Sequence, residues 1–348
     1  MDITILGIES SCDDTSAAVL RNNVLLSNVI ASQAVHVKYG GVIPELASRA
    51  HQQNIIPVVD TALKEAGVAA DRIDAIAFTR GPGLVGSLLV GVSFTKGLSI
   101  ARNIPMVEVN HLQGHILSHF IDLRDRTLPH PDFPFLCLLV SGGHTQIVRV
   151  DSPLEMEIIG TTIDDAAGEA FDKTAQLLGL PYPGGPAVSA LAEEGEPGAI
   201  ELARPMIHAP NLDMSFSGLK TSVLTAVQSA PDAGDEVFRR NLARGFVDAL
   251  VDVLAAKLVR AMKQTGLRNV VVAGGVSANR QLRQRLTAEV RRRRGTIFYP
   301  PMRLCTDNGA MIAAAGLARL EGMTAEELEA LKAKRSFGVS PRWQLSNL

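Results

Sequence analysis

The sequence predicts an α/β fold with two lobes, and three observations support this prediction. The chain has 348 residues, about twice the ~150 residues of a common domain. Hydrophobic residues make up 46% of it, which is enough to form a substantial core. Two stretches of the chain also follow one pattern, in which three antiparallel strands precede alternating helices and strands. This duplication lies in the pattern and not in the residues themselves.

In the first stretch, apolar runs at residues 3–8, 16–20 and 24–30 predict three strands. Arg21-Asn22-Asn23 separates the second run from the third, and asparagine tolerates the positive φ that a hairpin turn needs. The elements expected next are a helix at 44–66, a strand at 73–79, a helix at 85–101, a strand at 105–109 and a helix from His111.

In the second stretch, strands are expected at residues 135–140, 145–150 and 154–160, before a largely helical segment at about 165–265. A strand at 269–273, a helix at 277–294, a strand at 296–299 and a helix at 307–320 follow. A last helix is predicted from Thr324, because Thr324 and Glu327 have the spacing of a capping box.

The stretch at residues 124–134, which contains prolines and a histidine, is the expected boundary between the lobes. We therefore expect an N-terminal lobe at residues 1–130 and a C-terminal lobe at residues 131–348. The helical segment would be an insertion in the C-terminal lobe, and the last helix would pack back on the N-terminal lobe. Two such lobes resemble the actin, sugar-kinase and Hsp70 superfamily, a duplicated ribonuclease H-like fold that binds nucleotides between its lobes.

Composition excludes several classes of protein. A formal net charge of −2 argues against a generally basic protein, so any contact with nucleic acid must come from a local patch. Cys12, Cys137 and Cys305 are far apart and odd in number, which indicates neither a disulfide framework nor a paired-cysteine zinc site. The N-terminus does not resemble a signal peptide, and no apolar run approaches the ~20 residues of a membrane span. These features predict a cytoplasmic protein without a membrane segment.

His111 and His115 lie four residues apart, which on a helix places both imidazoles on one face, within reach of one metal ion. The same spacing also fits a polar helix face without a metal. A zinc peptidase would need a glutamate after the first histidine as its general base, but Leu112 stands there. His119 continues the same face, either as a spare ligand or as a surface residue.

Asp307 is the candidate for a third ligand. It lies at the start of a predicted helix, where the helix dipole favours a carboxylate. The alternative is that Asp307 only caps this helix. Two histidines and one carboxylate with open coordination positions suit Fe(II) or Zn(II).

Three turns can approach a nucleotide. Those at residues 10–15 and 141–145 occupy equivalent places in the two stretches, and their small residues leave backbone N–H groups free for an anion. Gly142 and Gly143 also allow close approach to the backbone. The turn at 274–279 opens a helix, so its glycines and the Asn279 side chain can face a nucleotide. Ordinary tight turns, the last capped by Ser277, explain the same residues without a ligand.

Two further motifs have competing interpretations. Residues 81–86 (GPGLVG), with Glu108 downstream, fit the G-x-G-x-x-G signature of dinucleotide-binding enzymes. Pro82 stiffens that loop, and the hairpins before it argue against a dehydrogenase. A basic stretch later in the chain fits either a solvated helix face or contact with an RNA backbone. It comprises Arg280, Arg283, Arg285 and Arg291–Arg294.

Taken in order, these segments resemble the bacterial family of tRNA N6-adenosine threonylcarbamoyltransferases (TsaD), once described as O-sialoglycoprotein endopeptidases. The resemblance covers nearly the whole chain. It is carried by residues 7–15 (GIESSCDDT), 39–48 (YGGVIPELAS), 81–86, the His111 and His115 pair, 139–146 (LVSGGHTQ), 168–173 (GEAFDK), 182–186 (YPGGP), 215–220 (SFSGLK), 273–280 (AGGVSANR), 305–313 (CTDNGAMIA) and 341–343 (PRW).

The resemblance implies an actin-like (ASKHA) fold and the transfer of a threonylcarbamoyl group from threonylcarbamoyl-AMP. The acceptor would be the N6 amine of the adenosine 3′ of the anticodon, in tRNAs that read codons beginning with A. One Fe(2+) or Zn(2+) ion per subunit would be held by His111, His115 and Asp307. Members act with an inactive paralogous subunit and a small ATPase subunit. The implied substrate pocket is lined by Leu139, Val140, Ser141, Gly142, Gly143, Asp172, Gly185 and Asn279.

Asp13 is our candidate for orienting or deprotonating the acceptor amine, although a turn aspartate near a phosphate also fits a structural role. Gln113 stands where many members have glutamate, which removes a negative charge beside the metal. Ser189 stands where some members have aspartate, so a contact to the threonyl group is in doubt. A small-molecule kinase of the same fold, a metal-binding scaffold and, less favoured, a metal-dependent peptidase are the alternatives.

Overall fold

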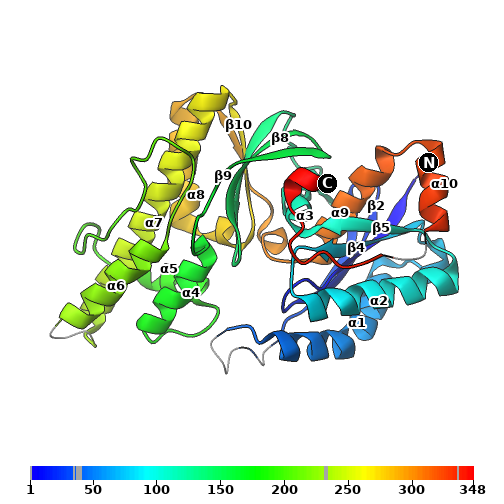
Figure 1. Cartoon of the computed structure of the whole chain (residues 1–348), viewed down its shortest axis with the longest axis horizontal. Helices are drawn as coiled ribbons and strands as arrows, with labels where there is room; N and C mark the ends of the chain where they lie inside the picture. The colour runs from blue at the N-terminus through cyan, green and yellow to red at the C-terminus, as the bar shows by residue number, and fades with distance from the viewer. Residues whose placement is uncertain (1, 34–35, 37–40, 231–233, 335–336) are drawn as a thin grey trace.

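The computed structural model describes residues 2–33, 36, 41–230, 234–334 and 337–348. They form a six-stranded sheet in the order β5-β4-β1-β2-β3-β6 and a five-stranded sheet in the order β11-β10-β7-β8-β9. Helices flank both sheets (Figure 1). Tyr39 and Gly40, in one of the segments that carry the family resemblance, lie outside the described residues.

The first sheet is built around three antiparallel strands, as predicted: β1 (Thr4–Glu9), β2 (Thr15–Arg21) and β3 (Val24–Ala31). Asn22 adopts a φ of 53° in the hairpin between β2 and β3. β4 (Ala75–Gly81) pairs in parallel with β1, and β5 (Met106–Asn110) pairs in parallel with β4. A two-residue strand that was not predicted, β6 (Asp122–Leu123), pairs with β3.

The second sheet repeats this arrangement with different residues. β7 (Phe135–Val140), β8 (Thr145–Ser152) and β9 (Glu155–Thr161) are antiparallel. β10 (Asn269–Ala273) pairs in parallel with β7, and β11 (Thr296–Phe298) pairs in parallel with β10. The duplicated pattern predicted from the sequence is therefore confirmed.

Two helices, α3 (His111–Leu117) and α9 (Gly309–Glu321), lie in a layer between the sheets. α1 (Pro44–Ala66) and α2 (Val85–Arg102) cover one face of the first sheet, and α9 (Gly309–Glu321) packs on β1, β2, β4 and β5 from the other side. α3 (His111–Leu117) packs against α9 and also contacts β7 and β10. One apolar cluster accordingly runs from the first sheet through α9 to the second sheet.

The remaining helices cover the far face of the second sheet (Figure 1). They are α4 (Ala167–Leu177), α5 (Gly184–Glu193), α6 (Ser217–Ser229), α7 (Glu236–Thr265) and α8 (Arg280–Arg292). The last of the longer helices, α10 (Ala325–Ala333), contacts β5 of the first sheet and has the predicted capping box between Thr324 and Glu327.

Two helix starts differ from the prediction because asparagine, not the expected residue, caps each helix. α8 begins at Arg280 and not at Ser277, since the Asn279 side chain accepts the Leu282 N–H at 2.8 Å. α9 begins at Gly309, where Asn308 accepts the Met311 N–H at 3.0 Å. The predictions that Ser277 caps α8 and that Asp307 caps α9 were therefore wrong. The Asp307 carboxylate is available for other contacts.

α9 approaches the first sheet closely because glycines face one another across the contact. A Cβ on Gly7 of β1 would lie 2.1 Å from the Gly309 carbonyl oxygen. A Cβ on Gly309 would lie 2.6 Å from the Ala18 nitrogen, and one on Gly316 would lie 2.4 Å from the Ala77 Cβ. This close packing sets the position of the loop that precedes α9.

The sequence predicted neither a disulfide framework nor a membrane span. Cys12, Cys137 and Cys305 are free, as expected. Among the described residues, none of the helices combines the length and the apolar character needed to cross a membrane.

Gly309→Ala should lower the free energy of unfolding by about 1–3 kcal/mol, the usual cost of overpacking, because its Cβ collides with the β2 backbone. Chemical denaturation measures this change. Gly97→Ala in α2 is the control, since a Cβ there meets no atom within 4 Å, and it should stabilise the helix by about 0.5–1 kcal/mol. Equal effects of the two substitutions would contradict the close-packing account.

Candidate functional site

α3 presents two histidines at the boundary between the lobes. The Asn110 side chain caps the helix by accepting the Leu112 N–H at 2.9 Å, so the helix starts immediately after β5. His111 and His115 are both buried, and their ring centroids lie 4.8 Å apart with an interplanar angle of 87°. The predicted i, i+4 pair therefore lies on one face of a short helix.

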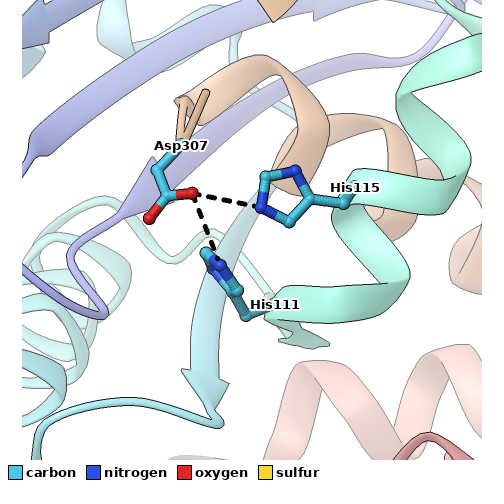
Figure 2. A group of neighbouring side chains, drawn as sticks. All are labelled: His111, His115 and Asp307. Atoms are coloured by element: carbon cyan, nitrogen blue, oxygen red, sulfur yellow. Dashed lines mark hydrogen bonds and ion pairs between the residues drawn. The ribbon is translucent and has the colours of Figure 1, made fainter. Parts of the chain in front are cut away.

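Asp307 lies opposite this pair, on the loop that leads into α9 (Figure 2). Its Oδ1 is 3.1 Å from Nε2 of His115 and 3.5 Å from Nε2 of His111. One potential ligand atom from each of the three residues lies within 4.8 Å of the others. Residues separated by almost 200 positions in the chain thus converge at one point.

The donor atoms of this cluster fit a metal ion. Metal–nitrogen and metal–oxygen bonds of about 2.0–2.1 Å in a tetrahedral site separate neighbouring ligand atoms by roughly 3.4 Å. The separations from Asp307 to the two imidazoles are close to that value. Two imidazoles and one carboxylate are also the donor set of many catalytic zinc and non-haem iron sites. The cluster is therefore compatible with a bound metal ion.

Gly114 allows α3 to approach α9. A Cβ on Gly114 would lie 3.0 Å from Cδ1 of Ile312 and 3.2 Å from Cγ of Met311. A larger residue would therefore push the two helices apart. Because α3 carries the histidines and α9 follows Asp307, this contact sets the separation of the three ligand atoms.

A buried carboxylate that sequence reasoning missed orients His111. Nδ1 of His111 donates to Oε2 of Glu9 at 3.0 Å, and Ser11 Oγ lies 3.1 Å from the same nitrogen. Thr79 Oγ1 donates to the same Glu9 oxygen at 2.7 Å, and the Ser11 backbone N–H donates to the other. With its Nδ1 proton held by Glu9, His111 turns its Nε2 toward Asp307. This is the common arrangement around metal-binding histidines.

The charges of the cluster compensate one another. Burial lowers the pKa of His111, but the carboxylates of Asp307 and Glu9 outweigh that effect and raise it to about 9. Burial would raise the pKa of Asp307, yet His111 and His115 hold it well below its usual range. In the absence of a cation, a protonated imidazole thus balances the carboxylates. Metal binding would displace this proton.

His144 extends the polar surroundings of the cluster from the second lobe. Burial lowers its pKa to about 4, and the nearby positive charge of His111 and His115 adds to this effect. His144 is therefore a neutral imidazole at pH 7, able to donate or accept a hydrogen bond. In the sequence, His144 stands out only as part of the motif at residues 139–146. Its proximity to α3 arises from the packing of the two lobes.

The turn between β1 and β2 carries two aspartates. His51 holds this turn, because its Nε2 donates to the Cys12 carbonyl at 3.0 Å and its Nδ1 accepts from Thr15 Oγ1 at 2.7 Å. Asp13, the predicted candidate for contact with the amine, is partly buried. Burial and the charge of Asp13 raise the pKa of the neighbouring Asp14 to about 7. Asp14 is therefore a candidate proton acceptor that sequence reasoning missed.

Asp172 lies near this turn although it belongs to the second lobe. Burial raises its pKa, and the negative charge of Asp13 contributes. Oδ1 of Asp172 accepts the Gly184 N–H at 2.8 Å, which ties α4 to the start of α5. A Cβ on Gly142, Gly143 or Gly185 would meet no atom within 4 Å, so the backbone at these glycines borders open space. These features suit a cleft between the lobes.

Other predicted pocket residues are committed to internal contacts. Leu139 and Val140 are fully buried in the core, which leaves only their main chain available to a ligand. The Asn279 side chain caps α8 and donates from Nδ2 to Ser189 Oγ at 2.8 Å. Ser189 in turn donates to the Gly185 carbonyl oxygen at 2.6 Å. Ser141 accepts the Gly168 N–H through its carbonyl at 3.1 Å.

His119 and Gln113, which lie on α3 or just after it, are not among the three residues of the cluster. His119 is buried, so the predicted alternative of a surface residue is wrong, and its Nε2 lies 3.2 Å from the Val272 carbonyl oxygen. It is not one of the three residues whose ligand atoms converge. Gln113 donates to the Pro153 carbonyl at 2.9 Å, so its amide is used within the fold.

The glycine-rich loop at residues 81–86 packs against protein. A Cβ on Gly83 would lie 2.5 Å from the Ser11 carbonyl oxygen, and one on Gly81 would lie 1.8 Å from that of Ser340. Glu108 pairs with Arg80 at 2.9 Å and so does not have the ribose-binding role of a dehydrogenase. The dinucleotide signature is thus a coincidence of spacing.

Much of the basic stretch on and after α8 is paired. Glu289 accepts from Arg292 and Arg293, and Arg280 pairs with Glu193 at 3.1 Å. Arg283 is partly buried, where it donates to the Ser277 carbonyl and stacks over Tyr299. These contacts favour a helix face with internal ion pairs, while Arg291 and Arg294 are exposed.

Comparisons with known proteins agree over nearly the whole chain. The family model of tRNA N6-adenosine threonylcarbamoyltransferase matches residues 24–314. A protein of this name from Porphyromonas gingivalis is 57% identical over 318 residues, which cover 90% of this chain and 93% of the relative. Another, from Ralstonia pickettii, is 52% identical over 353 residues, which cover 99% and 98%.

Solved structures support the fold alone. The crystal structure of T. kodakarensis HypF superposes with a TM-score of 0.59 at 15% identity, covering 92% of this chain and 48% of that one. The activator of the 2-hydroxyisocaproyl-CoA dehydratase from Clostridium difficile, with bound ADPNP, gives 0.52 at 16% identity, covering 97% and 100%. The predicted actin-like α/β fold is therefore confirmed.

Glu9→Gln should weaken metal binding by about 10- to 100-fold, because an amide no longer fixes the Nδ1 proton and the orientation of His111. Metal content after dialysis against a graded chelator measures the affinity, and circular dichroism checks the fold. Glu157→Gln, on the outer strand β9, is the control and should bind metal as the wild type does. Equal affinity of the Glu9 variant and the wild type would show that Glu9 does not orient a ligand.

Proposed function

Because the chain belongs to the family of tRNA N6-adenosine threonylcarbamoyltransferases, we propose that it transfers a threonylcarbamoyl group from threonylcarbamoyl-AMP to tRNA. The acceptor is the N6 amine of the adenosine 3′ of the anticodon, in tRNAs that read codons beginning with A. The observation that supports this proposal beyond the family match is the convergence of His111, His115 and Asp307, whose ligand atoms lie within 4.8 Å of one another.

The reaction requires positioning more than covalent catalysis. The amine nitrogen attacks the carbamoyl carbon, a C–N bond forms, the C–O bond to the phosphate breaks, and AMP leaves with the bonding electrons. The mixed anhydride is already activated, so no protein nucleophile is needed. The protein must align the amine with the carbonyl carbon and compensate the charge that develops on oxygen.

His111, His115 and Asp307 would hold one Fe(2+) or Zn(2+) ion. When bound, this ion supplies a Lewis acid for the negative charge on the carbonyl and phosphate oxygens. Glu9 keeps the His111 ring in the orientation that points Nε2 toward the site. The buried surroundings of both histidines limit the access of water, which strengthens electrostatic interactions there.

The second lobe would bind the adenylate. The backbone at Gly142 and Gly143 borders open space, which leaves room for a phosphate that their N–H groups would bind. Leu139, Val140 and Ser141 would support this turn, while Asp172 of α4, Gly185 of α5 and Asn279, the N-cap of α8, would form part of the wall. The hydrogen bonds among Asn279, Ser189 and Gly185 hold this wall together.

The acceptor amine would meet the turn between β1 and β2. Asp13 would orient the amine, a role supported by its proximity to Asp172, whose pKa its charge helps to raise. Asp14, with a pKa of about 7, suits the role of proton acceptor near neutral pH. The amine proton would pass to its carboxylate as the C–N bond forms.

We further propose that the chain works in the cytoplasm with an inactive paralogous subunit and a small ATPase subunit. The peptidase alternative lacks its general base, since the buried Leu112 follows His111. No feature of the site favours the kinase or the scaffold over the transferase.

Asp307→Ala should abolish formation of the modified nucleoside, because the proposed metal site loses the carboxylate that lies beside both imidazoles. Reconstitution with threonylcarbamoyl-AMP, tRNA and the partner proteins, followed by nucleoside mass spectrometry, measures this loss, and elemental analysis should show a parallel loss of metal. Asp151→Ala, an exposed aspartate on β8, should retain wild-type activity. Wild-type yield from the Asp307 variant would refute the proposed role of the triad.

Asp14→Asn should remove the ionisation near pH 7 from the rate profile. An aspartate that accepts a proton must be ionised, so the wild-type rate should rise with pH through about 7 and level off above it. Single-turnover rates at saturating tRNA between pH 5.5 and 8.5 test this. A profile that keeps the same inflection in the Asn variant would assign the ionisation to another group.

A further inference from the structure

A hollow of about 740 Å³ lies where the first sheet meets the loop before α9. It is bordered by β3, by the end of α1, by β6 with the turn after it, and by the short helical turn at Met302–Leu304. Three arginines line it: Arg124, Arg126 and Arg303. All three are exposed and come from segments far apart in the sequence.

The positive charge of this hollow is not neutralised within the fold. Arg124 donates to the backbone carbonyls of Glu65 and Ala66, at 3.5 and 3.4 Å, and so caps the end of α1 without meeting a carboxylate. Over the part of the chain that the structure describes, Arg126 and Arg303 form no ion pair. Glu65 and Asp125 are the acidic residues of the lining, so three arginines against two carboxylates leave an excess of one positive charge.

The hollow leads to the candidate metal site. Thr306, which immediately precedes Asp307, lines it. At its other border, Ile30 of β3 pairs with Ser16, and the Ser16 hydroxyl accepts the Gly309 N–H at 2.8 Å. The wall of the hollow is thus continuous with the loop that carries Asp307.

This position distinguishes the hollow from the basic stretch on α8. There, Glu289, Glu193 and Asp252 pair with four of the arginines. The hollow instead presents arginines without carboxylate partners, and its lining includes Thr306, the residue before Asp307. A chain with a net charge of −2 needs such a local site to attract a polyanion.

We propose that this arginine-lined hollow binds the phosphodiester backbone of the acceptor RNA and directs the RNA toward the metal site. The inference rests on the proposed function, because it takes the acceptor to be a tRNA. The guanidinium groups of Arg126 and Arg303 hold phosphates by paired, charge-assisted hydrogen bonds. Thr306, which lines the hollow, immediately precedes Asp307 of the candidate metal site.

The test is a double variant, Arg126→Glu with Arg303→Glu, in the full chain. The variant should bind tRNA at least tenfold more weakly than the wild type at the same salt concentration. The slope of log K against log salt should fall by about 1.5, the loss of roughly two phosphate contacts. Fluorescence anisotropy with labelled tRNA measures both quantities, and thermal unfolding checks the fold.

Two further variants sharpen the comparison. Arg126→Gln with Arg303→Gln removes the charge without reversing it and should weaken binding in the same direction by a smaller factor. Arg149→Glu changes an exposed arginine on β8 that pairs with Asp151, and should leave tRNA affinity within twofold of wild type. In the reconstituted complex, the Glu variant should raise KM for tRNA and keep kcat within twofold.

The outcomes separate this inference from the proposed function. Failure of the wild-type complex to modify tRNA would refute the function itself. If the wild type modifies tRNA and the double variant keeps its tRNA affinity and salt slope, the inference alone is wrong. Unchanged tRNA affinity with weaker binding of a partner protein, or of threonylcarbamoyl-AMP, would overturn it by assigning the hollow to that ligand.

Discussion

The packing of α3 against α9, in the layer between the two sheets, is the constraint on which the candidate site depends. Gly7 and Gly309 allow α9 to lie directly on β1, and Gly114 allows α3 to approach α9. Asn308 takes the role of helix cap and leaves Asp307 free to meet both imidazoles. The geometry of the cluster is therefore a consequence of backbone packing in the core and not of a flexible loop.

Electrostatic balance is the second condition for such a buried site. Two carboxylates, Glu9 and Asp307, lie on opposite sides of the His111 ring and stabilise its charged form. A divalent cation can replace the proton on His111, because the cation also supplies positive charge that compensates the two carboxylates. Burial and the nearby charge of Asp13 also raise the pKa of Asp14 to about 7 and raise that of Asp172.

Local periodicity predicted the fold well, because strands and helices are set by short-range patterns. The bounds of α1, β7 and β10 agree with the prediction, and the i, i+4 pair on α3 follows from helix geometry alone. Contacts between distant residues were less accessible: Glu9 lies 102 positions from His111, and no local pattern indicates that pair. The sequence offered Asp307 as a third ligand but left helix capping as an equal alternative, and only the folded chain shows its carboxylate beside both imidazoles. Asn279 and Asn308 took the capping positions expected of Ser277 and Asp307, because asparagine, serine and aspartate cap helices about equally well, whereas the burial of His119 follows from tertiary packing.

X-ray absorption spectroscopy of the metal-loaded chain tests the central claim most directly, because it reports the atoms bound to the ion. The account predicts two imidazole nitrogens and carboxylate oxygen at about 2.0–2.1 Å, and one imidazole fewer in His115→Ala. A spectrum without imidazole scattering, or one that the substitution leaves unchanged, would contradict the convergence of His111, His115 and Asp307 on a single ion.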